Sequence, residues 1–325
     1  MSIILTGGAG FIGSHLCAHF TKQKERVLVL DNLSRGKEEY LRYQTDQNYI
    51  DFQKIDIANI PLTALVVKEF HQQYPVDMVW HMAANSDIPA GTKRPSVDFN
   101  DTFVTTFSIL EAIRPLGIKK FTFASSDAVY GDHGPEKKLT ENTGPLLPIS
   151  YYGAMKLASE ALLSASAESY LERVWIFRFP NVVGTPATHG VIFDFINKLK
   201  VTPDRLEVLG DGSQKKLYIH IDELLEAMIF IVSNSNEKMN VFNIGPDDSG
   251  CSVTQIAEST VEIVSPKATI AYGTEPRGWV GDIPKFLYSV DKLSSLGWRS
   301  KSSSIEAVRK AIVEIFKQEL GNDKI

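Results

Sequence analysis

The chain has 325 residues, enough for one large or two modest domains with a substantial core. Its hydrophobic share of 43% and charged share of 22% are ordinary for a globular protein, and a net charge of -5 without a basic block gives no reason to expect nucleic acid as a partner. No apolar run reaches about 18 residues and apolar residues begin at position 3, so we expect no membrane partner and no cleaved leader.

Cys17 and Cys251 are the only two cysteines, too few for a disulfide framework and without metal-ligand spacing. We expect both to be small buried residues. The sequence therefore favours a reduced, cytoplasmic enzyme without a metal site.

The chain opens with an apolar strand over residues 2–6, a glycine-rich turn and a helix over 11–23. The turn fits G-x-G-x-x-G through Gly8, Gly10 and Gly13, and a looser pattern through Gly7, Gly10 and Gly13. Glycines there let the backbone turn sharply and approach a pyrophosphate, which faces the free N–H groups of the helix N-terminus. A tight strand-to-helix turn without a ligand would produce the same pattern.

The next strand, over 26–31, adds context to this motif. It ends in Asp31, 18 residues beyond Gly13. An acidic residue at that distance binds the adenosine ribose and disfavours a 2′-phosphate. The sequence therefore predicts an NAD site.

Further strands and helices alternate along the chain, which is typical of right-handed βαβ units in a parallel sheet. The predicted strands are 50–55, 76–82, 119–125, 173–178 and 240–244, and the helices are 61–73, 97–114, 152–170 and 303–320. Beyond residue 180 the elements shorten. We expect an α/β fold, a doubly wound parallel sheet (Rossmann) with a smaller α+β C-terminal substrate lobe. The expected domains are 1–180, which also receives the strand near 240–244, and 181–325.

Tyr152 and Lys156 stand four residues apart on a predicted helix, so both side chains lie on one face. An adjacent cation favours the phenolate, and lowering a tyrosine pKa from about 10 to about 7 takes roughly 4 kcal/mol. A surface pair of no function is the alternative for this motif alone. Ser126 follows a predicted buried strand, at the sheet edge where open α/β folds bind ligands. It could hold a substrate hydroxyl, or belong to an ordinary serine-rich strand exit.

Five motifs occur together in one order: Thr6-Gly-Gly-Ala-Gly-Phe-Ile-Gly13, Asp31-Asn-Leu-Ser34, His81-Met-Ala-Ala84, Ser125-Ser…Tyr130-Gly131 and Tyr152-x-x-x-Lys156. On these motifs the chain resembles the extended short-chain dehydrogenase/reductases, specifically the nucleotide-sugar epimerase/dehydratase branch typified by UDP-glucose 4-epimerase. The resemblance runs nearly end to end.

The resemblance implies specific roles. Tyr152 would take the proton of a sugar 4-hydroxyl while hydride passes from C4 to NAD, Ser126 would assist, and Lys156 would hold the nicotinamide ribose and lower the tyrosine pKa. The implied cofactor-binding residues are Gly7, Gly10, Phe11, Ile12, Gly13, Asp31, Asn32, Ser34, Arg35, Asp56, Ile57, Met82, Ala83, Ala84, Ser86, Tyr152, Lys156 and Pro180. The implied substrate-binding residues are Ser126, Asn181, Val191, Lys216, Arg277 and Asp282. A homodimer built from the helices near 97–114 and 152–170 is also implied.

Some residues differ from those usual in the branch, and these differences favour one reaction over another. Where dehydratases of the branch carry an Asp-Glu or Ser-Glu pair after the catalytic Ser or Thr, this chain has Asp127-Ala128, so Asp127 remains a catalytic candidate without the usual glutamate. Lys216 replaces an arginine, and Thr102 replaces an asparagine. The favoured function is a 4-epimerase of a nucleotide-activated hexose, with a UDP-sugar favoured. A 4,6-dehydratase or C4 dehydrogenase is the alternative, followed by a non-catalytic nucleotide sensor.

Overall fold

The computed structural model describes residues 1–42, 46–134, 137–274 and 287–321. These form two compact units. The first unit comprises 1–131, 144–178 and 232–242, and the second comprises 132–143, 179–231 and 243–325. Each unit is therefore assembled from three separate stretches of the chain.

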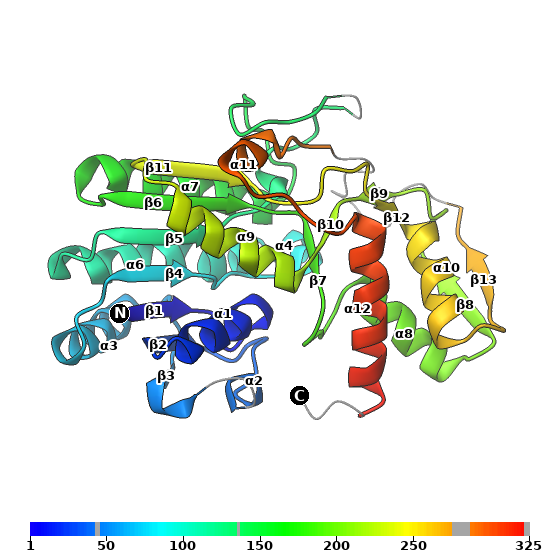
Figure 1. Cartoon of the computed structure of the whole chain (residues 1–325), viewed down its shortest axis with the longest axis horizontal. Coiled ribbons are helices and arrows are strands. Elements are labelled where there is room, and N and C mark those ends of the chain that lie inside the picture. Colours follow the sequence, from blue (N-terminus) through cyan, green and yellow to red (C-terminus); the bar gives the residue numbers. More distant parts are fainter. Residues whose placement is uncertain (43–45, 135–136, 275–286, 322–325) are drawn as a thin grey trace. The chain divides into compact units, whose positions relative to one another are not determined.

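The first unit is built on a seven-stranded sheet, whose strands follow one another in Figure 1. In spatial order they are β11 (Met239–Asn243), β6 (Arg173–Arg178), β5 (Lys120–Ala124), β4 (Met78–His81), β1 (Ser2–Thr6), β2 (Arg26–Asp31) and β3 (Ile50–Lys54). The strands from β3 to β6 pair in parallel. Strand order reverses between β1 and β4, which in doubly wound folds is the point where ligands bind. The predicted α/β fold is confirmed.

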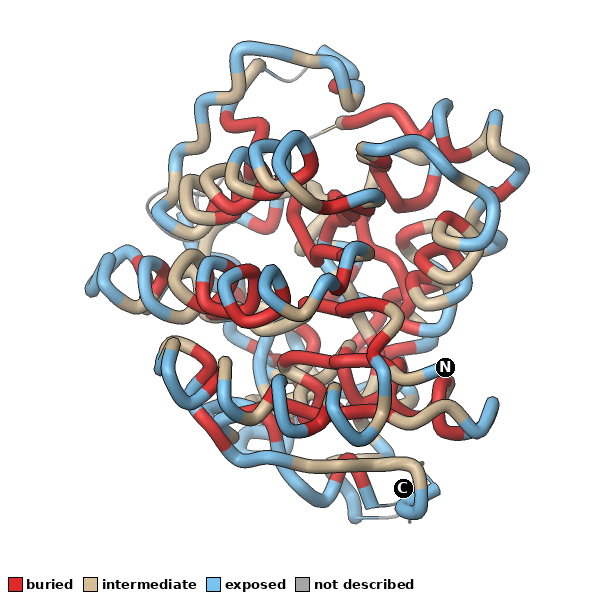
Figure 2. Tube along the Cα trace, turned by 90° about the vertical axis from the view of Figure 1, so that its left-hand side faces the viewer, coloured by how far each residue is buried: buried red, intermediate tan, exposed pale blue. Residues whose placement is uncertain are grey.

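Helices cover both faces of this sheet, as its continuous apolar strands require. One face packs against α3 (Ile60–Gln73), α6 (Thr105–Ile113) and α7 (Tyr151–Ser169) through a single buried cluster. On the other face Phe20 of α1 (Phe11–Lys22) contacts Trp80, which stacks on Phe177. Buried and exposed positions alternate along the helices, as expected of elements with one face on a core (Figure 2).

The helix predicted over 97–114 is interrupted. It consists of α5 (Ser96–Asp98), a π-helical segment η2 (Phe99–Val104), α6, and a 3₁₀ turn η3 (Arg114–Leu116). The hydroxyls of Thr105 and Thr106 donate to the backbone carbonyl of Thr102 at 3.1 and 2.8 Å. Side-chain donors of this kind compete for helix carbonyls, and this accounts for the wider turn.

Short elements complete the first unit: α2 (Glu39–Arg42), η1 (Gln47–Tyr49), α4 (Ile88–Lys93) and η4 (Asp127–Val129). In the described part of the second unit there are three two-stranded sheets, which pair β7 (Asn181–Val183) with β10 (Tyr218–His220), β8 (Arg205–Val208) with β13 (Thr269–Tyr272), and β9 (Lys215–Lys216) with β12 (Cys251–Ser252). Its helices are α8 (Val191–Val201), α9 (Ile221–Asn234), α10 (Val253–Val264), α11 (Asp291–Leu296) and α12 (Ser304–Glu319). Helices α8, α10 and α12 share one apolar core.

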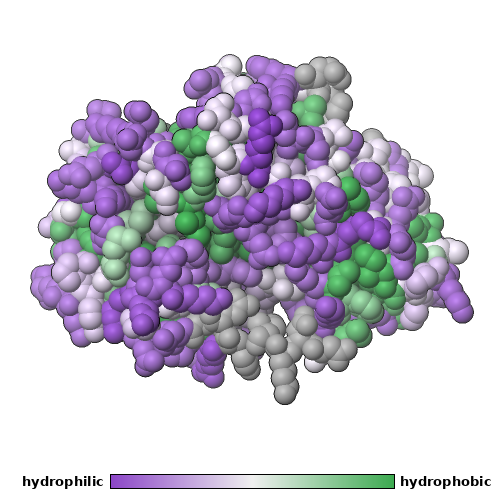
Figure 3. Space-filling model, viewed as in Figure 1, coloured by the Kyte–Doolittle hydropathy of each residue, from purple (hydrophilic) through white to green (hydrophobic). Residues whose placement is uncertain are grey.

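Hydrophilic residues predominate on the face drawn in Figure 3, where hydrophobic residues form separate clusters. Within the described ranges no helix combines the length and apolar character needed to cross a membrane.

Candidate functional site

The loop between β1 and α1 has room only for glycine at two positions. Gly7 has a φ of +66°, and a Cβ there would lie 2.8 Å from the backbone nitrogen of Ala83. A Cβ on Gly13 would lie 2.1 Å from the carbonyl oxygen of Gly7. Helix α1 begins after this loop with Phe11 and Ile12, and its N-cap residue has no side chain that could bond the N–H groups of the first turn. This cradle fits the pyrophosphate of a dinucleotide.

Asp31, at the end of β2, is tied to this loop. Its carboxylate accepts hydrogen bonds from the backbone N–H groups of Ala9 at 3.0 Å and Leu33 at 2.8 Å. Burial raises the pKa of Asp31, and these two bonds act against that rise. They hold the carboxylate at the carboxyl edge of the sheet, beside the glycine loop. Arg35 forms an ion pair with Asp87.

The remaining predicted cofactor residues of the first unit follow strands β2, β3 and β4. Asn32 accepts a hydrogen bond from the N–H of Ser34 at 2.9 Å, and Asp56 closes a turn after β3 that continues through Ile57. Met82, Ala83, Ala84 and Ser86 follow β4, the neighbour of β1. The backbone N–H of Ala83 donates to Thr6 Oγ1 at 3.2 Å, which joins the exits of β1 and β4.

Tyr152 and Lys156 lie in the first two turns of α7, on one helix face. Helix α7 starts after Ser150, whose hydroxyl accepts the N–H of Gly153 at 3.1 Å and so caps it. Lys156 Nζ donates to the carbonyl of Ala124 at 2.5 Å and lies 5.7 Å from the centre of the Tyr152 ring. Lys156 is buried, so this pair is not the surface pair that the motif alone left open.

Ser126 caps the short turn η4 beyond β5. Its hydroxyl accepts the N–H of Ala128 at 3.2 Å, donates to Asp127 Oδ1 at 3.1 Å, and is hydrogen-bonded to the Tyr152 side chain. The structure therefore brings Ser126, Asp127, Tyr152 and Lys156 together at the carboxyl end of the parallel strands.

Burial shifts the pKa values of Lys156 and Tyr152 in opposite directions. It lowers the pKa of Lys156 to about 7, although Glu160 and Asp98 act to raise it. It raises the pKa of Tyr152, against which the Ser126 hydrogen bond acts, while Asp127 and Asp98 raise it further. The phenolate thus needs more positive charge than these residues supply.

Of the predicted substrate residues, Ser126 belongs to the first unit, whereas Asn181, Val191 and Lys216 belong to the second, as does the predicted cofactor residue Pro180. Asn181 starts β7 and donates from Nδ2 to the carbonyl of Leu217 at 3.3 Å, Val191 starts α8, and Lys216 lies in β9. Arg277 and Asp282 lie outside the described residues.

Comparison of the chain with known proteins identifies its family. Residues 3–245 match the model of the NAD dependent epimerase/dehydratase family, about three quarters of the chain. The chain belongs to this family.

Solved structures of the family superpose over nearly the full length. A UDP-galactose 4-epimerase is 34% identical with a TM-score of 0.83, covering 98% of this chain and 100% of its own. The UDP-glucose 4-epimerase of Thermotoga maritima with UDP-glucose is 27% identical with a TM-score of 0.85, covering 98% and 100%. That of Thermus thermophilus in complex with NAD is 27% identical with a TM-score of 0.83, covering 97% and 99%.

Membership of an NAD-dependent family agrees with the glycine cradle.

His81, which precedes the Met82–Ala84 segment, is buried between Thr6 Oγ1 at 2.7 Å and Thr106 Oγ1 at 3.1 Å. Burial, with a smaller effect of Lys156, lowers its pKa to about 3, so it stays neutral. Its contacts connect β1, β4 and α6, which is a structural role.

A buried ionic network that the sequence did not reveal lies one turn beyond Lys156 on α7. Glu160 accepts two hydrogen bonds from Arg178, at 3.0 and 2.6 Å, and one from the hydroxyl of Ser125 at 2.5 Å. Arg178 also donates to the Tyr130 hydroxyl at 3.1 Å. The spacing of four residues from Tyr152 to Lys156 to Glu160 was the available signal. This network anchors the strand ends that carry Ser126.

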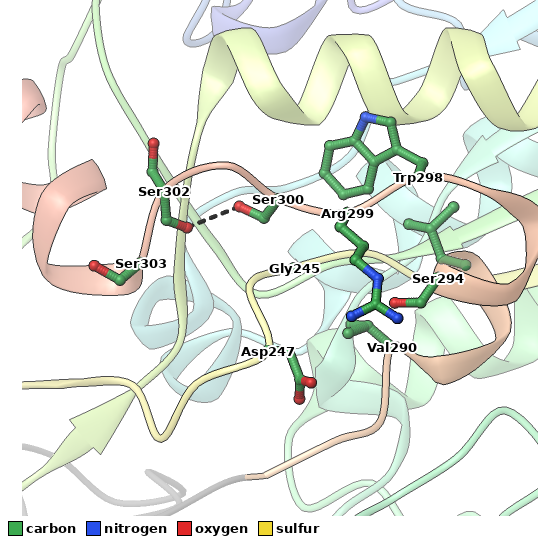
Figure 4. A pocket seen from close by; sticks show the side chains of 10 residues that line it. Gly245, Asp247, Val290, Ser294, Trp298, Arg299, Ser300, Ser302 and Ser303 are labelled. Carbon is green, nitrogen blue, oxygen red and sulfur yellow. Dashed lines mark hydrogen bonds between the residues drawn. The ribbon is translucent and has the colours of Figure 1, made fainter.

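A pocket of about 310 Å³ lies within the second unit. Figure 4 shows Arg299, Ser294 and Asp247 around it, with Trp298 at its edge. Among the described residues, none of the predicted site residues lines it. Within the described residues no group of three His, Cys, Asp or Glu side chains is placed to hold a metal ion.

Proposed function

We propose that the protein is an NAD-dependent 4-epimerase of a nucleotide-activated hexose, with a UDP-sugar as the favoured substrate. The observation that carries this proposal is the cluster of Ser126, Tyr152 and Lys156 in the unit that holds the glycine cradle. The names of the relatives, UDP-galactose and UDP-glucose 4-epimerases, support the choice of sugar nucleotide.

Each residue of the cluster has a distinct task. Tyr152 takes the proton of the sugar 4-hydroxyl and later returns it, acting as general base and then general acid. The hydroxyl of Ser126, bonded to Tyr152, holds the sugar oxygen in line with the phenol. Lys156, whose Nζ lies 5.7 Å from the centre of the Tyr152 ring, stabilises the phenolate. NAD, when bound by the cradle and Asp31, supplies a hydride acceptor and donor and a positive ring that favours the phenolate.

Epimerisation and dehydration differ in the acid and base groups they need. A 4,6-dehydratase must remove a proton at C5 and protonate the hydroxyl that leaves C6, whereas an epimerase needs neither. Ala128 has no ionisable group beside Asp127, and the carboxylate of Asp127 already accepts the Ser126 hydroxyl. This favours inversion at C4 through a transient 4-keto sugar, followed by rotation of the sugar and return of hydride.

The test is incubation with UDP-, GDP-, CDP- and dTDP-sugars in deuterated water, with products identified by NMR. We expect a C4-epimerised UDP-sugar with no deuterium at C5 or C6. A 6-deoxy-4-keto product labelled at C6 would establish the dehydratase, and a released 4-keto sugar the dehydrogenase. Nucleotide-sugar binding without any product would favour a sensor.

We also propose the remaining organisation of the enzyme. The lobe from about residue 181 binds the nucleotide-sugar through Asn181, Val191 and Lys216, and the region before it binds NAD. The protein forms a homodimer through α6 and α7, because Phe107 of α6 and Phe99 of the adjoining η2 are 38% and 49% exposed. A groove between the two helices is lined by Leu110 and Leu162 together with polar side chains such as Glu111. Two buried, unlinked cysteines are compatible with a cytoplasmic location, which cell fractionation tests.

A further inference from the structure

Asp98, the last residue of α5, is a buried carboxylate that the proposed mechanism leaves unexplained. Its exposure is 0%. Oδ1 accepts a hydrogen bond from Asn85 Nδ2 at 2.7 Å, whereas Oδ2 has no hydrogen-bond partner among the residues that the structure describes. A Cβ on Gly91 would lie 1.8 Å from Oδ2, so the fold keeps this space for the carboxylate. A buried charged oxygen without a donor destabilises a fold unless a counter-charge offsets it.

The packing of the neighbouring helices points to a buried lysine as that counter-charge. Both α5 and the π-helical segment η2 pack against α7, the helix that carries Tyr152 and Lys156. Burial raises the pKa of Asp98, and the hydrogen bond from Asn85 and the charge of Lys156 act against that rise. The ionised carboxylate in turn acts to raise the pKa values of both Tyr152 and Lys156. Lys156 is buried as well, so water screens this interaction little.

Glu160 is the other buried carboxylate near Lys156, and its direct effect on Lys156 is the larger one. However, Glu160 is already paired with Arg178 through two hydrogen bonds, so the guanidinium offsets most of its charge at a distance. Asp98 has no such cation bonded to it among the described residues. We therefore assign Glu160 to Arg178, with which it forms an ion pair, and Asp98 to Lys156.

We propose that Asp98 is a positioning residue of the epimerase site: its buried carboxylate is the counter-ion that holds Lys156 in its protonated form beside Tyr152. The inference rests on the proposed function for its role in turnover. The other carboxylates around Asp98 have cations of their own. Asp87 pairs with Arg35, and Asp101 on η2 interacts with Arg94.

The direct test is an NMR titration of the ¹⁵N-labelled lysine side chains in the full-length protein, with the Lys156 signal assigned by its loss in Lys156→Met. We expect wild-type Lys156 to titrate near 7. In Asp98→Asn, which keeps the shape and the bond from Asn85, the midpoint should fall by about one unit, a tenfold loss in proton affinity. The matched control Asp101→Asn removes the same charge from the adjoining segment and should leave the midpoint unchanged.

A second readout is the pH profile of turnover. Removing a negative charge makes Lys156 lose its proton, and Tyr152 ionise, at lower pH, so both limbs of the Asp98→Asn profile should move to the acid side. The ratio of variant to wild-type activity should then lie above one on the acid limb and below one on the alkaline limb, a fall of more than about tenfold between them. A purely structural role would lower activity equally at every pH and leave the Lys156 midpoint in place, which would overturn the proposal.

Failure to fold does not remove the test. If circular dichroism finds Asp98→Asn unfolded, Asp98→Ser removes the same charge with a smaller side chain. In the wild type itself, a Lys156 midpoint more than about one unit below 7 would contradict a counter-ion at this position. Because the titration needs no sugar, a shifted midpoint in a protein that turns over no nucleotide-sugar would refute the proposed function alone.

Discussion

At the scale of single residues, the acidity of Tyr152 is set by its surroundings, since burial raises its pKa while the hydrogen bond with Ser126 acts to lower it. We expect Tyr152→Phe to lower turnover by about 10²–10⁴-fold, the range typical of a lost general base. The dissociation constant for NAD, measured by calorimetry, should stay nearly unchanged because the ring and the helix remain.

Tyr151 provides the matched control for that prediction. It precedes Tyr152 on the same helix, but its side chain lies about 100° around the axis and is 51% exposed. Tyr151→Phe should retain most of the activity. Equal losses in the two variants would mean that a different tyrosine is the base.

A second residue-scale prediction concerns cofactor choice. The Asp31 carboxylate is fixed beside the glycine loop by the N–H groups of Ala9 and Leu33, and Arg35 is paired with Asp87 rather than left to accept a phosphate. NAD should therefore bind at least tenfold more tightly than NADP, a difference of about 1.4 kcal/mol. Similar dissociation constants for the two cofactors would show that Asp31 does not exclude the 2′-phosphate.

Sequence spacing placed Tyr152 and Lys156 together because they are local partners on one helix, and it placed Ser126 just beyond a strand; the catalytic roles of all three stay predictions. It could not find Asp98, whose importance comes from burial against a helix more than fifty residues away in the chain. Nor did it predict the buried ion pair of Arg178 with Glu160, because the two residues lie on different elements. The specific roles of the cofactor and substrate residues stay predictions.

At the scale of elements, His220 connects the end of β10 to α12. Its Nε2 lies 2.9 Å from Glu314 and its Nδ1 lies 3.2 Å from Asp222. Burial lowers the pKa of His220, but the bonds to Asp222 and Glu314 outweigh burial and raise it. A raised folded-state pKa stabilises the fold fully below the unfolded value and loses this contribution as pH rises through the folded value.

The pH dependence of stability tests this link. We expect His220→Gln to lower the free energy of unfolding by on the order of 1 kcal/mol at pH 6, where the imidazolium bonds both carboxylates. The difference from wild type should shrink as pH rises above the folded-state pKa. Urea unfolding at several pH values measures it, and a difference that is constant with pH would mean that only packing is lost.

Element boundaries followed the sequence closely where apolar runs were long, as in β1, β2 and β6, which have the predicted bounds. The helix predicted over 97–114 is wrong in its continuity. Its apolar spacing is helical, but the hydroxyls of Thr105 and Thr106 bond the Thr102 carbonyl and open a π turn. The spacing of apolar residues predicts which face of a helix is buried, but it does not predict where side-chain hydroxyls compete with backbone N–H groups for the helix carbonyls.

At the scale of the whole molecule, the proposed dimer gives a prediction in solution. Phe107 borders the groove between α6 and α7, and a charge there would be buried without a partner in a dimer. We expect Phe107→Glu to be a folded monomer by light scattering while the wild type is a dimer. A wild type that is monomeric at micromolar concentration would contradict the proposal.

The assembly of the first unit from three stretches of chain governs how it can be made. Strand β6 pairs with β11, which begins at Met239, far beyond the rest of the sheet in sequence. During synthesis the ribosome therefore releases β6 long before its outer neighbour exists, and its backbone N–H and C=O groups stay open to other chains. A gene fragment that stops near residue 180 would leave this edge uncovered permanently. We expect such a fragment to aggregate unless residues 232–243 are supplied as a second, co-expressed piece.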